Sequence, residues 1–216
     1  MIEIAAVNVG TPTVVATVEN ENVWSGIRKI PVSPLATLWL STVNLAGDEQ
    51  ADLSVHGGTD KAVYAYPSEH LDGWTEELGE ELGTAPFGEN IDTVGVLERD
   101  VCIGDVWSWG AALLQVSQPR WPCFKLALYR QRADIQSRMR ASGRTGWYLR
   151  VLQAGEVPAE GPIRVAARDP AGVTVLDAHS AMRDTHLREL DVARAVARHP
   201  ALADQWRAPI LERLDR

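Results

Sequence analysis

Cysteine is scarce in this sequence, which holds only Cys102 and Cys123 among its 216 residues. Two cysteines cannot form a disulfide framework in a chain of this length, and they cannot supply the several thiolates of a structural zinc site. Any chemistry that uses cysteine must therefore depend on a single thiol.

Long apolar runs are missing as well. A membrane-spanning helix needs about 20 consecutive apolar residues, and an export signal needs a basic, apolar leader with a cleavage site. The sequence shows neither pattern. We therefore expect a cytoplasmic protein that has no membrane partner.

Positive charge is in deficit, since 21 basic residues face 29 acidic ones and the formal net charge is −8 at pH 7. Nucleic-acid binding usually requires a basic face, and no cluster of basic and aromatic residues occurs along the chain. Nucleic acid is therefore excluded as an expected partner. Lysine is the rarer cation, and Lys29, Lys61 and Lys125 all fall in segments discussed below.

What the sequence does contain is a long region of β-type pattern. From Ile2 to about Val165, short runs of β-branched and aromatic residues are broken by glycine, proline and aspartate. This pattern predicts a mostly β domain over residues 1–168, of the barrel or sandwich type. Strands are predicted over residues 3–9, 13–18, 62–66, 101–107, 112–117, 147–153 and 163–167.

Helical patterns interrupt and then follow these strands. One crossover helix is predicted after Ser68, where Leu71 and Trp74 have helical spacing, and another over residues 133–141. Beyond Pro170 the helical period takes over, and residues 173–216 are predicted to form a small all-α subdomain of three helices.

The most informative segment surrounds Cys123. Pro119 and Pro122 restrain the backbone of this turn, while Arg120 and Lys125 supply positive potential that favours a thiolate. Such a turn can present a nucleophile or a metal ligand. The alternative is a small apolar residue buried in a proline-rich turn.

Cys102 serves as an internal comparison for Cys123. It lies in Val101-Cys102-Ile103, which has strand character and no neighbouring cation. We expect Cys102 to be buried in a strand and chemically inert.

A glycine pair precedes the predicted strand at residue 62. Backbone N–H groups at Gly57 and Gly58 can converge on a phosphate oxygen, and His56 or Lys61 can add positive charge. Asp60 adds a titratable carboxyl to the same segment. An ordinary tight turn is the alternative reading.

Two further segments carry paired polar groups. In one, Lys29 follows Arg28, and the alternative to a binding role is an exposed basic pair. In the other, Glu89 and Asn90 could read the donor and acceptor edges of a heterocycle, although a solvated turn explains them as well.

In their order and approximate spacing, these segments resemble the MOSC domain family, of the YiiM type. The resemblance covers almost the whole chain, including the helical tail. The segments that carry it are Lys29-Ile-Pro-Val32, Asp52 with His56-Gly-Gly58 and Asp60-Lys61, Phe87-Gly-Glu-Asn90, Gly104-Asp105, Pro119-Arg-Trp-Pro-Cys123 and Gly146-Trp147. Trp121 departs from the pattern, because a smaller residue is expected inside the cysteine turn.

The resemblance implies a β-barrel-like fold that holds a molybdenum cofactor in its molybdopterin form, with Cys123 as the ligand to the metal. A cofactor that already carries two dithiolene sulfurs needs only one protein thiolate, which agrees with the scarcity of cysteine. Contacts to the rest of the cofactor are then assigned to Lys29, His56, Gly57, Gly58, Lys61, Asn90 and Arg120.

The activity implied is reduction of N-hydroxylated compounds, such as hydroxylamine-type bases, amidoximes and hydroxamates. Cys123 is then catalytic, and Glu89, Asp60 and His56 are candidate proton donors. The expected partners are this small substrate, a separate electron-donor reductase and, as an option, a second copy of the chain. Two alternatives stay open: a sulfur or cofactor carrier that uses Cys123, and a binding module without turnover.

Overall fold

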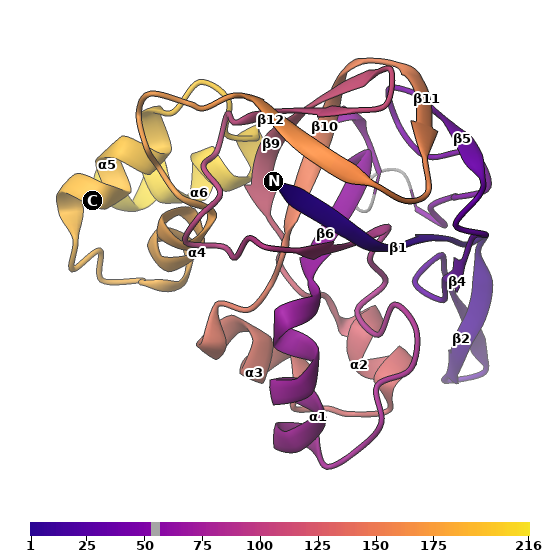
Figure 1. Ribbon diagram of the computed structural model, residues 1–216. Coiled ribbons are helices and arrows are strands. Elements are labelled where there is room, and N and C mark those ends of the chain that lie inside the picture. Colours follow the sequence, from indigo (N-terminus) through magenta and orange to yellow (C-terminus); the bar gives the residue numbers. More distant parts are fainter. Residues whose placement is uncertain (53–56) are drawn as a thin grey trace.

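A computed structural model describes residues 1–52 and 57–216, and within these ranges seven strands close into a barrel (Figure 1). Their order is β12-β8-β9-β10-β6-β7-β1, and β1 pairs back to β12. Neighbouring strands are antiparallel except β6 and β7, which are parallel. The predicted mostly β fold is confirmed. The strands are β1 (Ile2–Val9), β6 (Val63–Pro67), β7 (Ile91–Val94), β8 (Val106–Trp109), β9 (Ala112–Pro119), β10 (Trp147–Gln153) and β12 (Pro162–Ala167).

Short strands extend the barrel sheet or form separate two-stranded sheets. β2 (Thr13–Val18) and β3 (Glu21–Ser25) form a hairpin, while β4 (Ile30–Pro31) adds to β1, and β5 (Thr37–Leu40) pairs with β11 (Gly155–Pro158). Only β2 of these was expected, because two to five residues carry too little alternation to identify a strand.

The strand predicted over residues 101–107 is wrong over residues 101–105, since β8 begins at Val106. Residues 102–105 form a turn instead, in which Gly104 has φ of 92° and the Asp105 side chain accepts a 3.0 Å hydrogen bond from the Cys102 N–H. Cys102 is half-buried and makes one isolated bridge to Thr174. The expectation of a buried cysteine within a strand is therefore also wrong.

Three helices cover one end of the barrel (Figure 1): α1 (Leu71–Leu78), α2 (Phe124–Arg130) and α3 (Ile135–Ser142). Trp74 of α1 and Met139 of α3 pack with Phe87 in a second hydrophobic core beneath them. The crossover helices α1 and α3 were predicted. Helix α2 was not, because it buries only Leu126 and so shows no apolar period.

The C-terminal residues form α4 (Val175–Arg183), α5 (Leu190–Arg198) and α6 (Asp204–Leu214), which gather on one side of the barrel (Figure 1). A capping box begins α4: Asp177 N–H donates to Thr174 Oγ1 at 3.0 Å, and Thr174 N–H donates to Asp177 Oδ2 at 2.9 Å. The buried residues of these helices, such as Trp206, belong to the same core as Trp107 of the barrel. The division into two domains stays a prediction. None of the described helices is long and apolar enough to span a bilayer.

A pair of carboxyl groups lies inside this fold, next to β1. Glu89 is fully buried and accepts a 2.9 Å hydrogen bond from Phe87 N–H through Oε2, while Asp92 accepts from Asn8 Nδ2 at 3.3 Å. Among the described residues, none donates an N–H or O–H to Glu89 Oε1 or Asp92 Oδ1. Burial and the charge of Asp92 raise the pKa of Glu89 to about 8, and burial raises the pKa of Asp92 to about 6. At neutral pH, Glu89 therefore keeps its proton while Asp92 is ionised, which avoids two buried like charges side by side.

This pair predicts that stability falls as pH rises from about 4.5 to about 8. The folded-state pKa of Glu89, about 8, lies above its ordinary value of 4.5, so the native protein keeps a proton that the unfolded chain releases. The free energy of unfolding should decrease as pH rises through this window. Glu89→Gln, which stays neutral, should exceed wild type by about 2 kcal/mol at alkaline pH and by much less at mildly acidic pH.

Urea unfolding at about pH 5.5 and about pH 8.5 measures the effect. Glu160→Gln removes an exposed carboxyl and serves as the control, which should follow wild type. Equal pH slopes for Glu89→Gln and wild type would show that Glu89 is ionised in the native state.

Candidate functional site

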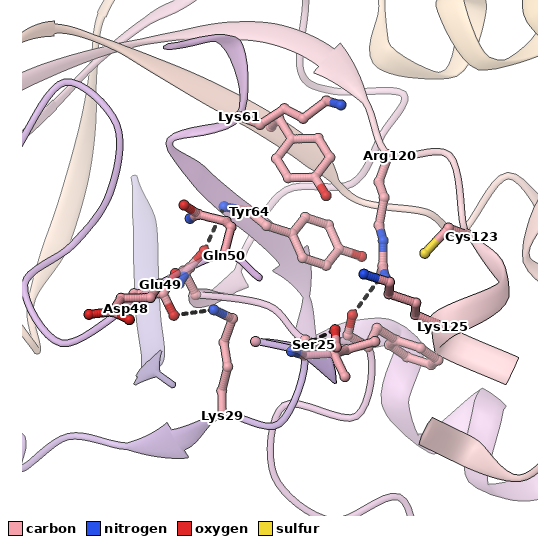
Figure 2. Close-up of a pocket in the computed structure, with 16 residues that line it drawn as sticks. Ser25, Lys29, Asp48, Glu49, Gln50, Lys61, Tyr64, Arg120, Cys123 and Lys125 are labelled. Carbon is pink, nitrogen blue, oxygen red and sulfur yellow. Dashed lines mark hydrogen bonds and ion pairs between the residues drawn. The ribbon is translucent and has the colours of Figure 1, made fainter. Parts of the chain in front are cut away.

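A cavity opens beside β6 and the end of β9 (Figure 2). Residues from six separate stretches of the chain line it, including Lys29, Lys61, Asn90, Arg120 and Cys123 from the sequence prediction. The fold thus brings together five candidates that are spread over almost a hundred positions. The other lining residues are Ser25, Gly26, Ile27, Asp48, Glu49, Gln50, Tyr64, Phe87, Gly88, Lys125 and Tyr148.

Asn90 ties the wall of the cavity to two strands. Its Oδ1 accepts a 3.0 Å hydrogen bond from Tyr64 N–H on β6, and its Nδ2 donates to the Asn8 carbonyl on β1 at 3.2 Å. The Asn90 backbone bonds the same two residues, at 2.8 Å each. The oxygen and the nitrogen of its carboxamide therefore bond mainly to the protein. Asn90 fixes the wall of the cavity and keeps little hydrogen-bonding capacity for a ligand.

Arg120 is a fixed cation at the centre of the site. Its Nη1 donates to the Phe87 carbonyl, and its guanidinium lies 4.6 Å from the centroid of the Tyr64 ring (Figure 2). Burial by itself lowers the pKa of Arg120, but Tyr64, Tyr148 and Cys123 outweigh it and raise the pKa. The side chain is only 6% exposed, so its charge faces the cavity and not bulk water.

Lys29 is buried, which excludes the exposed basic pair considered above; only its neighbour Arg28 is exposed. The Lys29 ammonium pairs with Asp48, which also accepts a 2.9 Å hydrogen bond from Gly10 N–H (Figure 2). Burial lowers the pKa of Lys29, while Asp48 opposes the shift. Its positive charge is therefore largely compensated within the protein.

Cys123 follows Pro122 and immediately precedes α2. The thiol is half-buried, and Figure 2 shows its sulfur directed into the cavity beside Arg120 and Lys125. Lys61 lines the same cavity; burial lowers its pKa, and Asp60 and Cys123 oppose that shift. Among the described residues, no group of three or more His, Cys, Asp or Glu side chains could hold a metal ion. Within that part of the chain, a metal in this cavity would have Cys123 as its soft ligand.

Two predicted catalytic carboxyls do not line the cavity. Asp60 forms an ion pair with Arg150, with a 2.8 Å contact to its Oδ1, and Glu89 is fully buried behind the wall with Asp92. Neither carboxyl can contact a molecule in the cavity as the structure stands. Sequence position alone could not show this, because Arg150 lies 90 residues from Asp60 along the chain, and the burial of Glu89 depends on how other segments pack around it.

The glycine segment is also displaced from the site. Gly57 and Gly58 are absent from the cavity lining, and Gly58 is exposed with φ of 96°. The left-handed conformation explains the glycine at position 58 without a bound phosphate. His56, the other candidate here, lies outside the described residues.

Sequence analysis missed two tyrosines of the site. Tyr64 on β6 and Tyr148 on β10 are direct cross-strand partners, and their ring centroids lie 5.2 Å apart. Tyr64 also donates a 2.8 Å hydrogen bond to the Thr145 carbonyl. Both residues fall in predicted strands, but only the pairing of β6 with β10 places them together.

Known proteins resemble this chain along most of its length. The model of the MOSC domain matches residues 52–164. Protein YiiM of Escherichia coli is 45% identical over 157 residues, which cover 71% of this chain and 69% of that protein. A protein of Gibberella moniliformis named "Reductase" is 35% identical over 150 residues, 68% of this chain but 27% of that protein.

The fold has a close counterpart among solved structures. The crystal structure of YiiM from Geobacillus stearothermophilus matches with a TM-score of 0.80 and 34% identity, over 99% of this chain and 100% of that one. Sequence and structure therefore agree: the chain belongs to the MOSC domain family and is of the YiiM type.

Proposed function

We propose that this protein is a molybdenum cofactor-dependent reductase of N-hydroxylated compounds, with Cys123 as the ligand to molybdenum. The observation that carries the proposal is the Cys123 thiol, which opens into a cavity beside Arg120 and Lys125. MOSC domains are associated with molybdenum cofactor binding, and one relative is named a reductase.

The residues of the cavity fit such a cofactor chemically. A molybdopterin carries a phosphate and two dithiolene sulfurs, so it needs cations and one further soft donor. Because Lys29 is compensated by Asp48, the phosphate is assigned to Arg120 and Lys125. Cys123 supplies the soft donor.

When bound, the cofactor supplies the two-electron chemistry of the reaction R–NH–OH + 2 e⁻ + 2 H⁺ → R–NH₂ + H₂O. The protein must hold the cofactor, orient the substrate and deliver protons. Lys61 Nζ is the proton donor we favour, because Lys61 lines the cavity and burial lowers its pKa toward the working range. It replaces Asp60 and Glu89 in this role.

The electrons are proposed to come from a separate reductase. The sequence contains no Gly-x-Gly-x-x-Gly after a strand and no Cys-x-x-Cys-His, so no flavin, nicotinamide or haem motif is evident. In the fungal relative named "Reductase", the matched segment is about a quarter of the protein. A larger polypeptide with room for an electron-transfer module is consistent with electrons that come from outside the MOSC segment.

The first prediction of the proposed function compares the two cysteines in protein made in a host that synthesises the cofactor. Cys123→Ala should lose bound molybdenum and at least about 100-fold of its turnover of hydroxylamines, because the metal loses its protein ligand. Cys102→Ala is the matched control, since Cys102 lies outside the cavity, and it should retain both. Elemental analysis and an assay with an artificial reductant measure the two properties.

The same experiment separates the alternatives. Metal without turnover in wild type would favour a cofactor carrier, and no metal at all would favour a sulfur carrier. Cys123→Ala protein that kept both molybdenum and turnover would refute the proposed ligand.

A second prediction uses the neighbours Asp60 and Lys61. Lys61→Gln should lower kcat by about 10-fold to 100-fold and flatten the alkaline limb of the pH profile, because the proton donor is lost. Asp60→Asn should change kcat little, since the Asp60 carboxylate faces Arg150. Molybdenum content, determined for each variant, corrects for cofactor loss. An unchanged pH profile in Lys61→Gln would exclude this lysine as the donor.

A further inference from the structure

The backbone of Phe87 joins two ionisable side chains on opposite sides of the cavity wall. Its N–H donates a 2.9 Å hydrogen bond to Glu89 Oε2, which lies behind the wall. Its carbonyl accepts a hydrogen bond from Nη1 of Arg120, which lines the cavity (Figure 2). One residue therefore connects a fully buried carboxyl to the cation that faces a bound anion.

Several ionisable groups face Glu89, and their charges decide the state of its proton. Burial and the charge of Asp92 raise the pKa of Glu89 to about 8, while Arg120 opposes this shift. The carboxyl is therefore neutral at pH 7 and ionises just above it. The groups that interact electrostatically with Glu89 are Lys29, Tyr64, Tyr66, Asp92 and Arg120.

The other neighbours of Glu89 do not change their charge in this pH range. Burial raises the pKa values of Tyr64 and Tyr66 above their ordinary value, so both hydroxyls stay protonated. Lys29 is held in its ion pair with Asp48. Glu89 is thus the group behind the wall whose charge changes just above neutral pH.

Ionisation of Glu89 places a second buried negative charge beside Asp92 and close to the cation of the cavity. Within the part of the chain that the structure describes, Arg120 forms no salt bridge, so its charge is available to a ligand. An ionised Glu89 compensates part of that charge. Because the surroundings have a low dielectric, an anion in the cavity then binds less tightly.

We propose that Glu89 is a positioning residue for Arg120, and that its proton switches the cavity between strong and weak anion binding. The neutral carboxyl holds the Phe87 backbone without cancelling the guanidinium charge. Binding of an anion and retention of the Glu89 proton therefore support each other. This role requires neither molybdenum nor turnover, so it is independent of the proposed function.

Sulfate is the probe for this role, because its charge, unlike that of phosphate, does not change near neutral pH. Calorimetry on the cofactor-free full chain measures sulfate affinity at about pH 6.5 and about pH 9. Wild type should lose about 10-fold of its affinity between these values, since Glu89 ionises within the interval. Glu89→Gln keeps an acceptor for Phe87 N–H and stays neutral, so it should lose about 3-fold or less. Ionisation of Lys61, whose pKa is lowered by burial, affects both proteins and cancels in the comparison.

Asp92→Asn is the sharper variant. It removes the negative charge that raises the pKa of Glu89, so Glu89 should ionise at lower pH. The midpoint of the drop in sulfate affinity should therefore move to lower pH, although the variant carries one carboxyl fewer. Loss of an acid that acted only through its own charge would strengthen sulfate binding and leave this midpoint in place.

Two further variants separate charge from position. Glu160→Gln removes an exposed carboxyl and should follow wild type at both pH values. Glu89→Ala removes the acceptor of Phe87 N–H, so it should weaken sulfate binding by about 3-fold to 10-fold even at the lower pH. If Glu89→Ala fails to fold, Glu89→Gln and Asp92→Asn still decide the question.

The role of Glu89 is overturned if wild type and Glu89→Gln show the same pH dependence, or if the midpoint in Asp92→Asn does not move. Wild type that binds no sulfate at the lower pH overturns it too. Failure of the proposed function looks different, because these affinities then stay as predicted while protein from a cofactor-producing host holds no molybdenum or reduces no hydroxylamine.

Discussion

The site depends on the two hydrogen bonds that the Asn90 carboxamide makes to β6 and β1. The carboxamide joins β6 at Tyr64 to β1 at Asn8 and so sets the course of the loop that carries Phe87. The Phe87 carbonyl in turn receives the Arg120 guanidinium, which lies over Tyr64. One buried amide therefore holds the strands, the wall and the central cation in a single network, where each lost bond would leave a buried polar group unsatisfied.

Buried charge is arranged in two ways around this network. Lys29 is compensated by Asp48, and Glu89 keeps its proton at neutral pH, so the Glu89–Asp92 pair carries about one negative charge instead of two. Within the part of the chain that the structure describes, Arg120 forms no salt bridge, and its guanidinium contacts the Phe87 carbonyl and the Tyr64 ring. Its charge is thus available to a bound anion, and the surrounding low dielectric strengthens that attraction.

The Cys123 thiol lies where the barrel and its loops meet α3 and the C-terminal helices. The barrel and its loops build the cationic cavity, whereas α3 and the C-terminal helices complete a neighbouring groove that is lined by Trp121, Arg140 and Trp206 among others. The tail shares the barrel core through residues such as Trp206, which also packs against Trp121. Packing of the tail and shape of the groove are therefore coupled: a change in the seating of α6 would move the wall beside the thiol.

The sequence by itself determined the β-rich class, the helical tail and the distinction of Cys123, because periodicity, composition and proline spacing are local properties. It also singled out Lys29, Lys61 and Arg120, which reach one cavity. Only the tertiary structure decided the direction and burial of each side chain. The Asp60 carboxyl turns to Arg150 on β10, Glu89 is buried behind the cavity wall, the half-buried Cys102 lies in a turn, and the pairing of β6 with β10 creates the tyrosine wall. These outcomes depend on contacts between segments far apart in sequence, which no local pattern records.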